Sequence, residues 1–501
     1  MSESVADGHV RPAADVRRRA GLAVAALPGA AWLAVLATAF VTRPLLPVDE
    51  TRYASVAWEM WRRGDFLVPY LNGQPYSDKP PLLFWLVAGG WSVLGPVEYW
   101  ARLVGPISAA VALMLTATLA RRLWPERRPL PLAAAVVLAG TLAWSVYSTL
   151  LLFDALLTVC VLTGLIGLVE SRRGRTRGFA LFALGIGFGV LAKGPVILIH
   201  LVPAAVTARW WDAGRTRTID AAAAVPARPR HWGLTLGLAG VAGVLIALAW
   251  AIPAGVAGGE AYARAIFLGQ TTGRMVRSFA HRRPFWWYLP QVLWMTLPWW
   301  MWPALWRSVR AAREAHRRGG PPAMDSGLRF CAVWAVGALV AFTLVSGKQI
   351  HYLLPELPAF ALVVARVALS NEPSVASPVM ARMAMLATGT LLVVIVAHVV
   401  GAPTLAARYE LRDVATHLAA VERSGAPIAH EGRYAGQFTF LGRLRRPIAE
   451  VPTDSISAWL AAHPSGRAVT YASVPADTGS GGVELVRRYR GKYVIVRRGS
   501  P

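Results

Sequence analysis

The stretch RRRAGLAVAALPGAAWLAVLATAFVT, residues 17–42, places three arginines directly before an uninterrupted apolar run over residues 22–42. A run of about 20 apolar residues is long enough to cross the hydrocarbon core of a bilayer as a helix. Arginines beside such a run stay on the cytoplasmic side. The stretch therefore predicts a membrane helix that leaves the cytoplasm. The alternative is a cleaved signal peptide, but the run is long and no clear small-residue cleavage site follows it.

The same pattern recurs along the chain. Hydrophobic residues make up 55% of the 501 residues and charged residues only 16%, against about 25% charged residues in ordinary soluble domains. This excludes extensive disorder and a single soluble core. The net charge of +25 would suggest nucleic acid in a soluble protein, but the arginines lie in short loops between apolar runs, as in membrane proteins. We therefore expect a lipid bilayer around the chain and no nucleic-acid partner.

The topology follows from counting crossings between the basic loops. The run 82–95 is too short to span comfortably and is predicted to be an interfacial or re-entrant helix. The runs 178–192 and 195–209 are flanked by basic loops on both sides, so we expect a hairpin with Lys193 at its outer tip. The result is about eleven crossings, with the N-terminus inside and the C-terminus outside.

Three regions follow from this topology. Residues 1–21 form a cytoplasmic segment, residues 22–403 form the transmembrane body with its first outer loop at 43–100, and residues 404–501 form a small α/β domain outside the membrane. In this last region we expect helices over 405–423 and 455–463. Short strands are expected at Ala468–Ser473 and Lys492–Val496, where brief apolar stretches alternate.

Ionisable residues gather on the outer side. The loop after the first span contains Asp49, Glu50, Arg52, Asp78 and Lys79. Each of these taken singly fits ordinary solvation, but further polar residues fall at the outer ends of other spans: Asp154, Lys193, Arg274, Lys348, His351 and Tyr352. Ionisable groups that line one cavity of a membrane protein favour a functional site.

A few carboxylates that face many cations suit chemistry at a phosphate group. Arginine offers bidentate hydrogen bonds to phosphate and lysine a point charge. A carboxylate among them is able to act as a general base toward a hydroxyl. Fixed cations neutralise the charge that develops on a phosphorylated leaving group.

The cysteines and the histidines within the spans give little indication of a functional site. Cys160 and Cys331 fall inside apolar runs and indicate buried thiols rather than a disulfide or zinc site. His200 and His398 lie within spans and are predicted to be packed or hydrogen-bonded. Glu356 lies near the outer end of its span and is an open candidate. No His, Cys or carboxylate spacing predicts a metal site.

Several motifs resemble the first periplasmic loop of bacterial membrane glycosyltransferases. They begin with Asp49-Glu50-Thr51-Arg52-Tyr53-Ala54 and Asp78-Lys79-Pro80-Pro81 and continue with Ala192-Lys193-Gly194-Pro195 and Tyr352-Leu353-Leu354-Pro355. The resemblance covers residues from about 40 to 360. The group that the chain resembles is the lipid A aminoarabinose transferases, also called the ArnT-like transferases. They are related to the protein O-mannosyltransferases.

This resemblance implies an all-α polytopic membrane protein with the GT-C fold, juxtamembrane helices and an active site on the periplasmic face of the inner membrane. It implies inverting transfer of a sugar from polyprenyl (undecaprenyl) phosphate. The acceptor would be lipid A in lipopolysaccharide, another envelope glycan or a protein.

The resemblance also implies a role for each matching residue. Asp49 would be the catalytic base and Asp154 a second catalytic residue, which together with Lys193 would support or orient the carboxylate. The donor phosphate would be bound by a set of residues from both sides of the cavity: Arg52, Lys79, Arg274, Lys348 and Tyr352. Glu50 and Asp78 would have supporting roles.

Two departures distinguish this chain from the aminoarabinose transferases. A glutamate precedes the loop lysine in that group, whereas Asp78 stands here. Their later loop carries a Glu-His pair before an arginine, whereas Gln270 and Thr271 precede Arg274 here. We therefore expect a different donor or acceptor and no strict metal requirement, although a divalent ion is an alternative.

Two other classes of function are considered. A transporter or lipid flippase would place ionisable residues deep within the spans and break its helices near mid-membrane. A scaffold or sensor would depend on residues 404–501 and not on Asp49.

Overall fold

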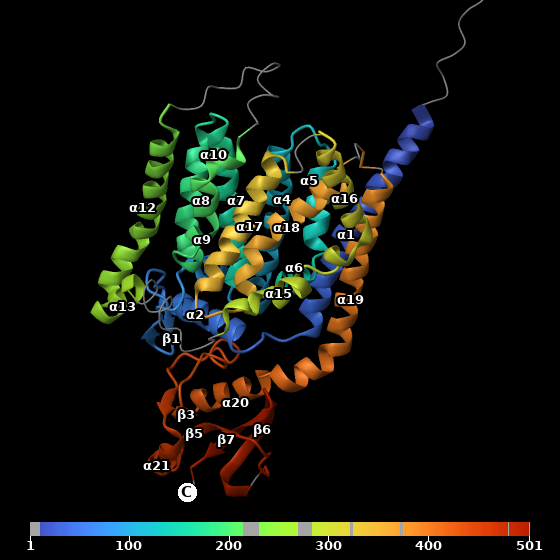
Figure 1. Cartoon of the computed structure of the whole chain (residues 1–501). Coiled ribbons are helices and arrows are strands. Elements are labelled where there is room, and N and C mark those ends of the chain that lie inside the picture. Colours follow the sequence, from blue (N-terminus) through green and yellow to red (C-terminus); the bar gives the residue numbers. More distant parts are fainter. Residues whose placement is uncertain are drawn as a thin grey trace, which may run out of the picture.

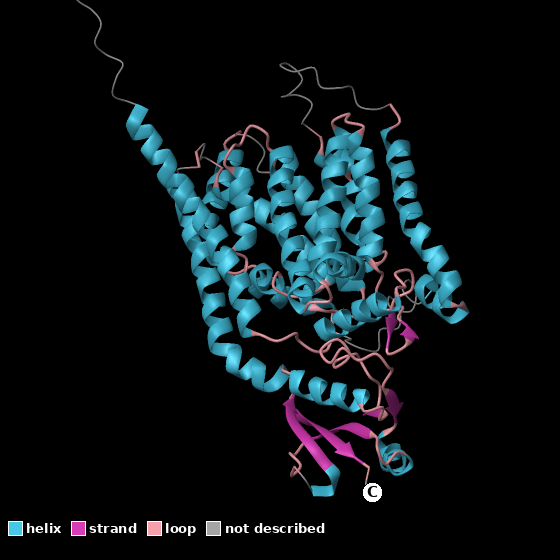
Figure 2. Ribbon diagram, turned by 180° about the vertical axis from the view of Figure 1, so that it is seen from behind, coloured by secondary structure: helices cyan, strands magenta, loops and turns pink. Residues whose placement is uncertain are grey.

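The computed structural model describes residues 11–213, 230–268, 283–320, 324–370, 374–375, 377–478 and 480–499. A tall helical body makes up most of the molecule, and a small domain with a β-sheet lies beyond one end of it (Figure 1). Seen from behind, the strands are confined to that domain and to a short hairpin beside the body (Figure 2).

Six helical segments of the described chain are long and apolar enough to cross a membrane. Four of them are single helices: α4 (Glu98–Leu123), α7 (Phe153–Arg172), α12 (Trp232–Gly258) and α17 (Ser326–Leu344). The fifth, Ile350–Ala368, consists of η4 (Ile350–Glu356) and α18 (Leu357–Ala368). The sixth begins with α19 (Pro378–Tyr409), which leads into α20 (Arg412–Arg423). The protein is thus a multi-pass membrane protein. The count of about eleven crossings stays a prediction.

Further helices complete the body. Their bounds are α1 (Arg11–Thr42), α5 (Leu130–Ala139), α6 (Leu142–Tyr147), α8 (Arg177–Lys193), α9 (Ile197–Val206), α10 (Ala208–Trp211), α13 (Glu260–Arg264), α15 (Tyr288–Met295) and α16 (Pro303–Arg317). The expected hairpin is confirmed, because α8 ends at Lys193 and α9 returns beside α7.

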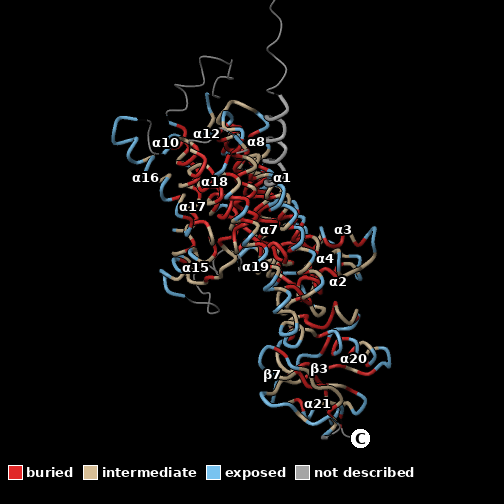
Figure 3. The backbone as a smooth tube through the Cα atoms, turned by 90° about the vertical axis from the view of Figure 1, so that its right-hand side faces the viewer, coloured by how far each residue is buried: buried red, intermediate tan, exposed pale blue. Residues whose placement is uncertain are grey.

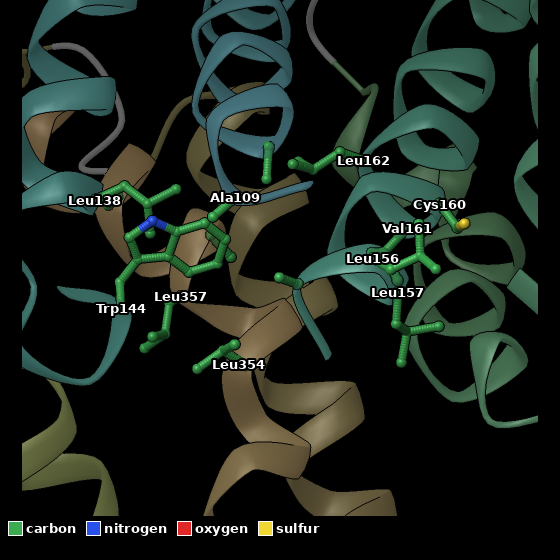
Figure 4. Close-up of a cluster of buried hydrophobic side chains, with 14 of the residues drawn as sticks. Ala109, Leu138, Trp144, Leu156, Leu157, Cys160, Val161, Leu162, Leu354 and Leu357 are labelled. Atoms are coloured by element: carbon green, nitrogen blue, oxygen red, sulfur yellow. The ribbon is translucent and has the colours of Figure 1, made fainter. Parts of the chain in front are cut away.

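Helix α7 lies at the centre of the body. It packs against α4, α8, α9 and η4, and most of its side chains are buried. Beside it, Trp144 lies among Leu138, Leu354 and Leu357 (Figure 4). The tube view shows buried residues filling the body and exposed residues along its rim (Figure 3). A helix that is apolar on every side is expected to be surrounded by other helices.

The apolar run 286–306 does not form one continuous span. It is divided into η2 (Phe285–Trp287), α15, η3 (Trp299–Met301) and the start of α16. Pro298 and Pro303 lack the N–H that a helix interior needs. The Leu297 carbonyl instead accepts a hydrogen bond from Leu142 N at 2.9 Å, so a packed neighbour satisfies a backbone group that the break releases.

The loop that follows α1 forms a compact layer at the end of the body nearest the small domain. It holds α2 (Asp49–Arg63), the hairpin of β1 (Tyr70–Leu71) and β2 (Gln74–Pro75), and α3 (Leu82–Leu94). The prediction of a short helix near 82–95 is confirmed. Tyr53, Val56 and Met60 of α2 are buried in the main core, which fixes one face of α2 to the body.

The C-terminal domain contains a five-stranded sheet in the order β4-β3-β5-β7-β6. Its strands are β3 (Ile428–Glu431), β4 (Ala449–Val451), β5 (Arg467–Ala472), β6 (Val483–Tyr489) and β7 (Lys492–Arg498). β3 pairs in parallel with β4 and β5, and β7 pairs antiparallel with β5 and β6. The expected strands are confirmed.

Helices cover this sheet and connect it to the body. α20 and α21 (Ile456–Ala462) belong to the domain, together with η5 (Thr453–Ser455) and η6 (Ser480–Gly482). Leu418 of α20 packs with Phe438 and Val494 in a separate core. Helix α19 continues past residue 403 to Tyr409, so the body and the domain share one helix across the predicted boundary.

Candidate active site

Asp49 is the first residue of α2, where the unpaired backbone N–H groups favour negative charge. Its side chain is 47% exposed and forms an ion pair with Arg52, one turn later, through Oδ1. Tyr53 Oη lies 3.4 Å from the same oxygen. Within the described part of the chain, both hydrogen bonds to the carboxylate use Oδ1, which leaves Oδ2 open. Asp49 is therefore oriented and still accessible.

The proton of Tyr53 is held firmly. Burial raises the pKa of Tyr53 well above its ordinary value, and the Asp49 carboxylate raises it further. The phenol therefore keeps its proton at neutral pH and donates it toward Asp49. Tyr53 was not among the predicted site residues, although it lies one helical turn after Asp49.

Glu50 has a different environment from Asp49. It is 2% exposed, and its Oε2 lies 2.5 Å from Arg43 Nη1. It also accepts hydrogen bonds from Leu46 N at 2.8 Å and Leu151 N at 2.7 Å. Glu50 thus ties the entry to α2 to the segment before α7, which agrees with a supporting role.

A second carboxylate lies at the start of α7. Asp154 is 2% exposed and forms an ion pair with Lys193, the last residue of α8. Lys193 Nζ also lies 4.6 Å from the ring centroid of Tyr352 in η4. The structure therefore brings together three predicted residues that are far apart in the sequence.

His351 joins this group. Its Nε2 lies 4.0 Å from Asp154 Oδ2, and its ring lies 5.1 Å from that of Tyr352 and 6.2 Å from that of Tyr147. Tyr147 was not a predicted candidate. His351 was expected, with Lys348 and Tyr352, among the ionisable residues at the outer end of a span that line the cavity, but no role was assigned to it.

Lys79 lies near the second carboxylate. Its Nζ lies 6.0 Å from the ring centroid of Phe153, the residue before Asp154, and Phe153 packs edge-on against Tyr53 at 4.9 Å. Lys79 acts electrostatically on Asp154 and on His351, and Asp49 also acts on His351. The charges of α2, α7, α8 and η4 thus share one neighbourhood, with Asp78 half-buried beside Lys79.

The remaining predicted residues lie elsewhere. Lys348 is buried, and its Nζ donates to the carbonyls of Val345 at 2.5 Å and Arg283 at 3.4 Å. It therefore holds the backbone before η4, and phosphate binding by Lys348 stays a prediction. Arg274, with Gln270 and Thr271, lies outside the described residues.

The histidines within the spans are hydrogen-bonded, as expected. His200 is fully buried and its Nδ1 pairs with Glu356 Oε1, while His398 Nδ1 lies 2.9 Å from the Val394 carbonyl in its own helix. The pair of His200 with Glu356 joins α9 to the end of η4. Within the described ranges, no three His, Cys, Asp or Glu residues are placed to hold a metal ion, so no step is derived through a metal.

Comparison with known proteins agrees with this architecture. Residues 78–252 match the family described as dolichyl-phosphate-mannose-protein mannosyltransferase. The chain is similar to the undecaprenyl phosphate-alpha-4-amino-4-deoxy-L-arabinose arabinosyl transferase of Pseudomonas paraeruginosa, at 32% identity over 63% of this chain and 54% of that protein. The protein of the same name from Pectobacterium carotovorum is 29% identical over the same shares. The matched region spans about half the length of these relatives.

Solved structures show the same fold. The ArnT structure from Cupriavidus metallidurans bound to undecaprenyl phosphate matches with a TM-score of 0.68 at 19% identity, over 94% of this chain and 97% of that one. The Archaeoglobus fulgidus oligosaccharyltransferase in its apo form matches with a TM-score of 0.50 at 12% identity, over 85% and 64%.

The chain therefore has the fold of the GT-C membrane glycosyltransferases. Within that class, its resemblance to the aminoarabinose transferase group is confirmed.

Proposed function

We propose that this chain is an integral-membrane glycosyltransferase that moves a sugar from a polyprenyl phosphate to an acceptor at the periplasmic face of the inner membrane. Undecaprenyl phosphate is the proposed carrier, because the similar enzymes are named for it and the matching ArnT structure from Cupriavidus metallidurans is bound to it. The acceptor is lipid A, another envelope glycan or a protein. The C-terminal domain lies on the same side as the site.

One observation carries this proposal. The exposed carboxylate of Asp49 and the buried carboxylate of Asp154 lie in one group with the cations of Arg52, Lys79 and Lys193. The group forms at the end of the helical body that faces the C-terminal domain (Figure 1). Such a set provides a base together with counter-charges for a phosphate.

The proposed reaction is a single displacement. Asp49 takes the proton of the acceptor hydroxyl as its oxygen bonds to the anomeric carbon of the sugar. The bond between that carbon and the phosphate oxygen breaks, and its electron pair leaves with the polyprenyl phosphate. Arg52 and Lys79 stabilise the charge on the leaving phosphate, with Arg274 and Lys348 as further proposed phosphate ligands. Attack opposite the leaving group inverts the anomeric carbon.

Asp154, Lys193 and Tyr352 have a positioning role in this proposal. The buried ion pair of Asp154 with Lys193 fixes the outer ends of α7 and α8. The Tyr352 ring beside Lys193 keeps η4 against that pair, and its hydroxyl is a proposed phosphate contact. Glu50 and Asp78 hold the loop segments on either side.

The sugar is proposed to differ from aminoarabinose. Asp78 stands where the similar enzymes carry glutamate, and Gln270 and Thr271 stand where they carry a Glu-His pair. Both positions adjoin proposed phosphate ligands. Aspartate keeps the charge of glutamate on a shorter side chain, whereas Gln270 and Thr271 remove a carboxylate. With one negative charge fewer, a donor without a basic amino group suits this site better.

Lipid analysis of cells tests the proposal. Lipids are extracted from cells that lack the protein and from cells complemented with wild type or Asp49→Asn, and sugar-bearing polyprenyl phosphate is measured by mass spectrometry. We expect it to accumulate without the protein and with Asp49→Asn, but not with wild type. The mass of the accumulated lipid gives the sugar class.

An unchanged donor pool, together with unchanged envelope glycolipids and glycoproteins, would contradict transfer. The transporter alternative would then gain weight, since the pair of His200 with Glu356 is the kind of buried ionisable pair that it predicts. A sensor built on residues 404–501 would instead tolerate Asp49→Asn and fail when that domain is removed.

A further inference from the structure

The segment 434–448 of the C-terminal domain, here called the brace, lies against the outer face of α2. Ser55 of α2 is fully buried. Its Oγ donates to the Gly436 carbonyl at 2.6 Å and accepts from Phe440 N at 3.0 Å. One hydroxyl therefore satisfies two backbone groups of a segment that is more than 380 residues away in the sequence.

A second set of contacts lies one turn further along α2. Trp58 Nε1 donates to the Leu444 carbonyl at 2.9 Å. The Arg443 guanidinium lies 5.4 Å from the Trp58 ring and 3.8 Å from that of Phe440. Phe440 in turn stacks on Trp91 of α3 at 5.3 Å, with an angle of 10° between the planes. Aromatic and cation–π contacts of this kind add to simple burial.

A third set fixes the hairpin that follows α2. The Asn72 side chain donates to the Ile448 carbonyl at 2.9 Å and accepts from Ile448 N at 2.8 Å. On its other side, Glu59 of α2 accepts from Asn72 N at 2.5 Å and Gly73 N at 3.0 Å. The hairpin is thus held between α2 and the brace.

We propose that the brace is a positioning element for the reaction, and that Ser55 and Asn72 are positioning residues which act through Asp49 and Arg52. This rests on the proposed function. One face of α2 is fixed by the membrane core, and the brace fixes the other. Ser55 lies one turn beyond Arg52, about 9 Å along the axis from Asp49. A helix held at these points cannot rotate without moving both charged groups.

Two glycines of the domain give a matched test. At Gly436, φ is +79°, and an added Cβ would lie 3.1 Å from Ser55 Cβ and 2.7 Å from Leu71 Cδ1. At Gly432, φ is +68° and an added Cβ would meet nothing within 4 Å. Both Gly→Ala changes carry the same left-handed backbone strain. Only Gly436→Ala also pushes on α2.

A second pair of glycines, in the loop that contains α2, tests the contact between the hairpin and the brace. A Cβ at Gly73, where φ is +78°, would lie 2.8 Å from Pro447 Cγ in the brace. At Gly64, the residue after α2, φ is +67° and an added Cβ again meets nothing within 4 Å. Gly73→Ala and Gly64→Ala thus repeat the comparison within the first outer loop.

The experiment measures transfer kinetics and amide hydrogen exchange of the full-length protein in lipid nanodiscs. We expect Gly436→Ala and Gly73→Ala to lower kcat about 10- to 100-fold, as small displacements of reacting groups do, with the KM for donor within about twofold. Exchange over residues 49–56 should be faster in both. Gly432→Ala and Gly64→Ala should match wild type in kcat and in that exchange.

The outcomes separate the two proposals. Unchanged exchange over 49–56 in Gly436→Ala, or faster exchange with unchanged kcat, overturns the positioning role. So does an equal loss of kcat in both members of a pair. If wild type transfers no sugar, the proposed function fails, and the exchange comparison still decides whether the brace holds α2. Should Gly436→Ala not fold, Ser55→Ala removes both hydrogen bonds without added volume, and the same criteria apply.

Discussion

At the scale of single residues, the environment of each carboxylate decides what it does. Asp49 and Glu50 are neighbours in the sequence, yet Asp49 is half-exposed and Glu50 is enclosed by Arg43 and two backbone N–H groups. A carboxylate whose acceptor sites are all occupied is a structural group. One that keeps an oxygen accessible is available to a substrate hydroxyl. Asp49 is therefore the residue to test for proton transfer.

We expect Asp49→Asn to lower the transfer rate by about 10²- to 10⁴-fold, the usual contribution of a general base. The amide is isosteric and cannot take a proton. Asp65→Asn is the matched control in the same loop, because Asp65 Oδ1 accepts from Leu67 N and Val68 N and an amide oxygen does the same. Transfer by purified protein is the measurement. Equal rates for Asp49→Asn and Asp65→Asn would show that Asp49 is not the base.

The ion pair of Asp154 with Lys193 predicts a stability effect. Lys193→Met leaves Asp154 buried without its partner, which typically costs about 3–5 kcal/mol. The double variant Asp154→Leu/Lys193→Met removes both charges, so it should regain most of the thermal stability but no transfer activity. Thermal unfolding in detergent and transfer assays measure the two effects. Full activity of the double variant would contradict a role for the pair in the reaction.

At the scale of elements, the turn between α8 and α9 decides where Lys193 lies. Gly194 has φ +81° and ψ −165°, a conformation that is almost restricted to glycine. It stops α8 directly after Lys193 and starts the reversal toward α9. The position of the ammonium therefore depends on one residue that carries no functional group.

Gly194→Ala should destabilise the protein by about 1–3 kcal/mol and also lower transfer, because the strain is relieved by moving Lys193. Gly259→Ala is the control. Gly259 ends α12 at φ +83° and ψ +170°, and neither glycine has a neighbour within 4 Å of an added Cβ. We expect a similar loss of stability there with transfer retained. Equal transfer in the two variants would argue against this role for the turn.

At the scale of the whole molecule, the site and the C-terminal domain lie at the same end of the helical body (Figures 1 and 3). Helix α19 runs from the body to Tyr409, directly before the domain, and the brace returns to α2. A domain joined by a short link after a helix and by a second contact is held in one orientation. The side of the membrane on which it lies is therefore also the side of the site.

Cysteine labelling tests this orientation. Ser465→Cys lies on the exposed surface of the C-terminal domain, and Ala315→Cys lies on the exposed surface of α16. A membrane-impermeant maleimide added to spheroplasts should label Ser465→Cys and should reach Ala315→Cys only after lysis. The two native cysteines, Cys160 and Cys331, are buried, so wild type is the background control. The reverse pattern would invert the predicted topology.

Local signals in the sequence determined much of this protein. Apolar runs and arginine positions identified a membrane body, the short helix near 82–95, the hairpin at Lys193 and the strands after residue 404. The motifs around Asp49, Lys79 and Tyr352 supplied the candidate site residues, whose roles stay predictions. These features follow from hydropathy, charge and residue order, which act over a few turns of chain and are readable without a fold.

Only the tertiary structure decided how these pieces meet. It paired Asp154 with Lys193, placed His351 beside Asp154 and added Tyr53 to the site. It also enclosed Glu50, directed Lys348 to backbone carbonyls and broke the run 286–306 at its prolines. It also laid the brace on α2. Such contacts depend on the packing of side chains between segments far apart in the sequence, and periodicity along one segment carries no information about the segment that will lie against it.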